Sequence, residues 1–171
     1  MVRGPKLIVL RGPSGSGKST VAKIIFKEAQ HKTVLIEQDY YRFIFNPPGG
    51  DMKPNTGTIH RLILHNTLEA LKDGYDVILE GILSVKSYNG ILEEIFRQHP
   101  QDNYIFYFDI SLEETIRRHT TRPDKTLMFG EEEMRKWYPR AHKSNHELEQ
   151  IIPEQYSVKE TVKYIKQTAG L

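Results

Sequence analysis

The sequence predicts an α/β fold in which a parallel sheet of five strands is covered by helices on both faces, giving three layers. Strand-like and helix-like segments alternate along the 171 residues, and the first strand-like run leads directly into the motif G-x-x-x-x-G-K-[ST] at residues 12–19. Such alternation produces parallel strands joined by right-handed crossovers. Ligands of these sheets bind at the carboxyl ends of the strands, which is where the motif falls.

Five short runs are rich in the apolar, β-branched and aromatic residues that are typical of buried strands. They lie at residues 7–10, 32–37, 76–80, 103–109 and, more weakly, 148–152. Helical segments are expected between and after them, at residues 21–26, 59–72, 87–98, 111–119 and 157–167. Ser111 and Glu114 form an S-x-x-E pattern, which predicts a capping box at the start of the fourth helix. No repeat or long linker divides the chain, so a single domain over residues 1–171 is expected.

The motif predicts a loop that binds the phosphates of a nucleotide, because it lies between a buried strand and a helix. Its glycines permit unusual backbone conformations, so that successive N–H groups converge on phosphate oxygens at a helix N-terminus. The Lys18 ammonium would reach the β- and γ-phosphates, and the Ser19 hydroxyl would bind Mg²⁺. The predicted nucleotide-binding residues are Gly12, Pro13, Ser14, Gly15, Ser16, Gly17, Lys18, Ser19 and Thr20.

The composition of the chain excludes several kinds of site and of protein. The chain has no cysteine, which excludes disulfides and thiolate metal sites, and its formal net charge is only +2. No apolar run has the length of a membrane span, so a cytoplasmic protein without a membrane partner is expected. Residues 117–143 include eight Lys and Arg but only four acidic residues. This local excess suits a polyphosphate ligand.

Acidic residues follow three of the predicted strands. Asp39 comes just after the second strand, Glu80 ends the third and Asp109 ends the fourth. The carboxyl ends of parallel strands meet at one edge of the sheet, so these side chains are expected near the phosphate loop. A carboxylate there can orient a hydroxyl group and accept its proton during phosphoryl transfer.

With the phosphate loop, Asp39 and the run Arg118-His119-Thr120-Thr121-Arg122, the chain resembles the small P-loop kinases. These include nucleoside and nucleotide kinases, shikimate and gluconate kinases, polynucleotide kinase and antibiotic phosphotransferases. The resemblance implies the strand order 2-3-1-4-5 and an arginine-bearing lid at about residues 119–145. It also implies that Asp39 is the base that receives the proton of the acceptor hydroxyl.

The same resemblance suggests roles for the other candidates. Glu80 would hold Mg²⁺ with Ser19; alternatively Glu80 contacts the acceptor, or Asp39 shares the metal. Arg118 and Arg122 would neutralise charge on the transferring phosphoryl group. A loop at about residues 40–57 would close over the acceptor, with Tyr41 and Arg42 as its contacts.

The resemblance therefore implies an ATP- and Mg²⁺-dependent enzyme that transfers the γ-phosphate to a small-molecule hydroxyl or phosphate acceptor. A nucleoside, a nucleotide or an antibiotic-like compound is the favoured acceptor. One alternative is a 5′-hydroxyl polynucleotide kinase, although the small net charge does not favour nucleic acid as a partner. Another is a nucleotide-dependent switch that hydrolyses slowly. The sequence does not indicate an oligomeric state.

Overall fold

The computed structural model describes residues 3–47, 55–126, 128–140, 142–144 and 146–171. Its centre is a five-stranded sheet in the order β2-β3-β1-β4-β5, with every neighbouring pair parallel. The predicted fold class and strand order are confirmed. The strands are β1 (Leu7–Arg11), β2 (Thr33–Glu37), β3 (Asp76–Gly81), β4 (Asn103–Asp109) and β5 (Glu149–Pro153).

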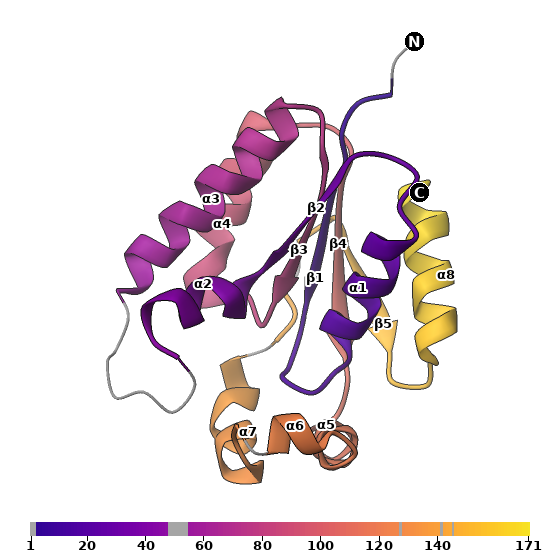
Figure 1. Cartoon of the computed structure of the whole chain (residues 1–171). Coiled ribbons are helices and arrows are strands. Elements are labelled where there is room, and N and C mark those ends of the chain that lie inside the picture. The colour runs from indigo at the N-terminus through magenta and orange to yellow at the C-terminus, as the bar shows by residue number, and fades with distance from the viewer. Residues whose placement is uncertain (1–2, 48–54, 127, 141, 145) are drawn as a thin grey trace.

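Two pairs of helices cover the sheet, one pair on each face (Figure 1). On one face α3 (Thr56–Lys72) and α4 (Val85–Gln98) contribute Ile63 and Ile95 to a core that includes Leu7 and Val9 of β1. On the other face α1 (Lys18–Lys27) and α8 (Val158–Ala169) pack over Ile8. Alternate β1 residues thus enter different cores, as the two-residue period of a strand requires. None of the helices in the described residues is long and apolar enough to cross a membrane.

A group of short helices lies beyond the carboxyl end of the sheet (Figure 1). These elements are α5 (Leu112–Thr120), α6 (Pro123–Thr126), α7 (Glu131–Trp137) and the 3₁₀ turn η1 (Tyr138–Arg140). They include most of the segment expected to form the lid, and "lid" below means the described residues of 119–145. The Ser111 side chain caps α5 by accepting the Glu114 N–H, but Glu114 does not complete the predicted box. Its carboxylate binds Arg117 and Arg118 instead.

The segment after β2 differs from the expected loop at residues 40–57. Residues 38–45 form a helix, α2 (Gln38–Phe45), while residues 48–54 lie outside the described part of the chain. The loop prediction was therefore wrong for the first part of this segment. None of the α2 residues is buried, and its eight residues are fewer than the ~11–18 over which a repeating apolar face identifies a helix.

One ion pair lies completely inside the protein. Arg11, the last residue of β1, and Glu149, the first of β5, have side chains that are 1% and 3% exposed, with 3.5 Å between Arg11 Nη1 and Glu149 Oε1. Glu149 also accepts hydrogen bonds from the N–H and the hydroxyl of Ser144. The pair therefore ties the chain that returns from the lid to β1, the strand that leads into the phosphate loop, across the intervening β4.

Replacing Arg11 with methionine leaves the Glu149 carboxylate buried without its cation. We expect Arg11→Met to lower the free energy of unfolding by about 3–5 kcal/mol, the usual result of removing one partner of a buried pair. The matched control is Arg97→Met, because Arg97 pairs with Glu94 on the surface and should contribute little. Urea unfolding measures both variants, and an equal, small effect would contradict the buried-pair interpretation.

Candidate active site

The phosphate loop connects β1 to α1 through three glycines in backbone conformations that favour glycine. Gly12, Gly15 and Gly17 have φ values of 145°, 80° and 100°. A Cβ added to Gly15 would lie 2.7 Å from the carbonyl oxygen of Thr115 and 2.9 Å from the Cε of Met134. The loop therefore needs glycine at this position both for its turn and for close contact with α5 and α7.

Lys18 begins α1 and its side chain is buried against the phosphate loop. Its Nζ donates hydrogen bonds to the carbonyl oxygen of Pro13 at 2.7 Å and to the hydroxyl of Ser16 at 3.2 Å. Burial lowers the pKa of Lys18, while the charges of Glu80 and Asp39 act in the opposite direction. A buried ammonium beside a cradle of backbone N–H groups is suited to an anionic ligand such as phosphate.

Ser19 and Glu80 meet at the carboxyl edge of the sheet. The β1–β3 register pairs Leu10 with Glu80, and the Ser19 hydroxyl donates to Glu80 Oε1 at 2.9 Å. Burial raises the pKa of Glu80, while Lys18 and the Ser19 hydrogen bond oppose the shift.

The Ser19 hydroxyl and the Glu80 carboxylate offer two oxygen ligands that fit Mg²⁺. This ion is commonly bound by one or two protein oxygens together with phosphates and water. Within the described residues there is no group of three or more His, Cys, Asp or Glu that could hold a metal without such help.

The two predicted arginines have different surroundings. Arg118 is anchored by Glu114, and its Nη1 donates to the carbonyl oxygen of Ser16 at 3.0 Å in the phosphate loop. Arg122 instead donates from Nη2 to Thr20 Oγ1 at 3.2 Å and lines the cavity described below. Arg118 is thus placed to position the loop. Of these two arginines, Arg122 is the one that lines the cavity.

Asp39 lies in the first turn of α2. The preceding residue, Gln38, anchors this turn to the end of β3 and to the residues that follow it. Gln38 Oε1 accepts the backbone N–H of Leu83, and its side chain occupies the space that a Cβ on Gly81 would need. Asp39 itself forms an ion pair with Arg42 at 3.1 Å, and both side chains are exposed. Asp39 is also close enough to influence the pKa values of Lys18 and Glu80.

The phosphate loop, α2, β3 and the lid enclose a cavity of about 500 Å³. Eight of the predicted site residues line it: Ser14, Gly15, Lys18, Ser19, Asp39, Arg42, Glu80 and Arg122. Residues outside the predicted set of site residues also line it, namely Phe43, Asn46, Pro47, Gly81, Ile82, His119, Met128, Phe129, Glu133 and Trp137. The only signal for most of these was their place in the expected loop or lid.

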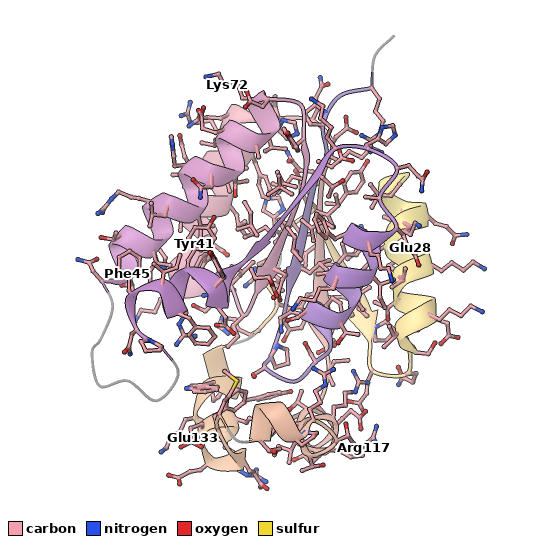
Figure 2. All side chains as sticks on the ribbon, in the orientation of Figure 1. Glu28, Tyr41, Phe45, Lys72, Arg117 and Glu133 are labelled. Atoms are coloured by element: carbon pink, nitrogen blue, oxygen red, sulfur yellow. The ribbon has the colours of Figure 1, made fainter. Side chains whose placement is uncertain are left out.

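Tyr41 is a predicted acceptor contact that the structure does not bring to this cavity. Its hydroxyl accepts a hydrogen bond from Asn66 Nδ2 at 2.7 Å, and its ring packs partly against the core. In Figure 2 Tyr41 lies where α2 meets α3, and Glu133 belongs to the separate lid region. Tyr41 therefore joins two helices, because it lies on the face of α2 opposite to the cavity-lining Asp39 and Phe43.

The sheet order and the glycine-rich loop before α1 define the fold of the small P-loop kinases. The sequence profile described as AAA domain (AAA_33) matches residues 7–148, and the chain belongs to this family. No curated protein matches the sequence.

Solved structures show the same fold at low sequence identity. A gluconokinase from Sinorhizobium meliloti 1021 is 17% identical, with a TM-score of 0.71 over 99% of this chain and 94% of that one. The Mycobacterium tuberculosis APS kinase in complex with AMPPNP and APS is 15% identical, with a TM-score of 0.74 over 99% and 100%. A chain of the Pnkp1/Rnl/Hen1 RNA repair complex is 22% identical, with a TM-score of 0.60 over 84% and 46%.

The Gly15 contacts lead to a prediction for nucleotide binding. We expect Gly15→Ala to weaken ATP binding by about tenfold or more, because backbone strain of about 1–3 kcal/mol then falls on the loop itself. Gly74→Ala is the control, since Gly74 has a φ of 79° but open space around it and lies far from the loop at the end of α3. Calorimetric titration with ATP would contradict the expectation if both variants bound equally well.

Proposed function

We propose that this protein is an ATP-dependent phosphotransferase that moves the γ-phosphate to a hydroxyl group of a small molecule. The observation that carries the proposal is the shared cavity, in which Asp39 lies in the same space as Lys18 and Glu80. The volume of about 500 Å³ leaves room for an acceptor beside the phosphates. The structural relatives named above, a gluconokinase and an APS kinase, support the same class of reaction.

The residues of the phosphate loop and its neighbours bind and orient the nucleotide. The backbone N–H groups of the loop and the Lys18 ammonium hold the phosphates, and Arg122 neutralises charge on the transferring group. Ser19 and Glu80 would hold Mg²⁺, which supplies further neutralisation of phosphate charge when it is bound. Phosphoryl transfer depends mainly on such positioning and electrostatics.

Asp39 completes the reaction on the acceptor side. The acceptor oxygen forms a bond to the γ-phosphorus while the bond from that phosphorus to the β,γ-bridging oxygen breaks. The proton of the acceptor hydroxyl passes to a carboxylate oxygen of Asp39, which later releases it to water. The ion pair of Asp39 with Arg42 orients the carboxylate until the acceptor arrives.

Substitution of Asp39 tests this assignment. We expect Asp39→Asn to lower kcat for phosphoryl transfer by about 10²-fold or more, with a nearly unchanged KM for ATP, because only the proton acceptor is lost. Asp109→Asn is a matched control, since Asp109 is another exposed aspartate at a strand end and pairs with Lys143 at 2.7 Å. Activity of Asp39→Asn within a few-fold of wild type would remove the proposed role.

The reaction itself is tested by transfer of radiolabelled γ-phosphate from ATP. Acceptor mixtures would contain nucleosides, nucleotides, sugars, antibiotics and 5′-hydroxyl oligonucleotides. We expect a labelled product with at least one mixture that is formed faster than inorganic phosphate. Slow hydrolysis that no mixture stimulates would favour a nucleotide-dependent switch, and transfer only to oligonucleotides would favour a polynucleotide kinase.

A further inference from the structure

Aromatic and apolar side chains of α2 and the lid form part of the cavity lining. Phe43 of α2 lines it, and so do Phe129 and Trp137 of the lid. The Phe129 ring is stacked on His119 with 4.6 Å between centroids and meets Trp137 edge to face at 5.0 Å. His119 Nε2 also contacts the carbonyl oxygen of Phe129 at 2.9 Å. These contacts hold the lid aromatics in place before a ligand binds, which favours stacking of a flat ring.

The charges around the cavity are balanced before any ligand binds. The described lining holds three cations and three carboxylates, namely Lys18, Arg42 and Arg122 with Asp39, Glu80 and Glu133. Each cation already has an assigned neighbour: Arg42 pairs with Asp39, and the other two lie at the phosphate loop. Glu133 adds a negative group on the lid side, where its carboxylate accepts the N–H of Gly130.

Binding of the phosphates changes this balance. Magnesium-bound ATP adds about two negative charges, so the occupied cavity has an excess of negative charge over the described cations. A second anion on the acceptor would be repelled by these charges in a partly dehydrated site. An uncharged acceptor avoids this repulsion, and the aromatic wall offers it a binding surface that requires no charge.

We propose that the acceptor is an uncharged hydroxyl compound with an aromatic ring, of the nucleoside type, whose ring packs against Phe43 and the lid aromatics. The inference rests on the proposed phosphotransferase function and adds the class of acceptor. The acceptor hydroxyl lies at Asp39 and loses its proton to that carboxylate as the new bond to the γ-phosphorus forms. The aspartate–arginine pair thus serves the reaction rather than recognition of an anionic acceptor.

A paired set of acceptors tests the class with the full-length wild-type protein. Adenosine and uridine provide an uncharged ring with a hydroxyl, ribose lacks the ring, and gluconate and a 5′-hydroxyl oligonucleotide add negative charge. We expect kcat/KM for at least one nucleoside to exceed that for each of the other three by about tenfold or more. Better transfer to ribose, gluconate or the oligonucleotide overturns the acceptor class while leaving the kinase function intact. If none of these compounds is phosphorylated, the proposed acceptor class is overturned. The broader acceptor mixtures described above then decide whether the protein is a kinase.

Two phenylalanines of α2 provide a matched pair of variants. Phe43 and Phe45 are 36% and 39% exposed, but only Phe43 lines the cavity. We expect Phe43→Ala to raise KM for the nucleoside about tenfold and Phe45→Ala to leave it unchanged. Trp137 is the only tryptophan of the chain, so nucleoside binding to the ADP-bound protein should also quench its fluorescence. Equal KM values in the two variants, or no quenching at saturating nucleoside, would overturn the proposed ring site.

Discussion

The parallel pairing of β1 with β3 is the constraint on which the site depends. Its register places Leu10 beside Glu80. The Glu80 carboxylate therefore lies next to the start of α1, where the Ser19 hydroxyl donates a hydrogen bond to it at 2.9 Å. β2 pairs with the other edge of β3, which brings Asp39 to the same end of the sheet. Three segments far apart in the sequence therefore supply one cavity, and a shift of register would separate them.

The region beyond the sheet is joined to this edge by charged side chains. Arg118 links α5 to the carbonyl of Ser16 in the loop, while the buried pair of Arg11 and Glu149 fixes the return from the lid to β5. Removal of either partner would leave the other charge buried and unpaired, so loss of this connection is expected to destabilise the fold. Phe129 and Trp137 of the lid form part of the cavity wall, to which Phe43 of α2 also contributes.

Short local signals were enough to predict the strands and the loop, because most strands contain an apolar run and the loop has a fixed spacing of glycines and lysine. The strand order was predicted from the resemblance to the small P-loop kinases. The helix α2 was not predictable in this way, since it buries no residue and has no side-chain cap. Residues such as Phe129 and Arg118 carry no pattern that distinguishes cavity lining from loop support. Their places depend on the tertiary packing of α5 and α7, which spacing along the chain does not specify.

In the proposed reaction, nucleotide and acceptor share one cavity, so that the phosphoryl group passes directly between them. Phosphorus NMR of the wild-type protein with magnesium, ATP and a nucleoside measures this most directly. We expect equal growth of the ADP signals and of a new phosphate monoester signal, with little inorganic phosphate. Growth of inorganic phosphate alone, at a rate that the nucleoside and other hydroxyl compounds do not change, would contradict it.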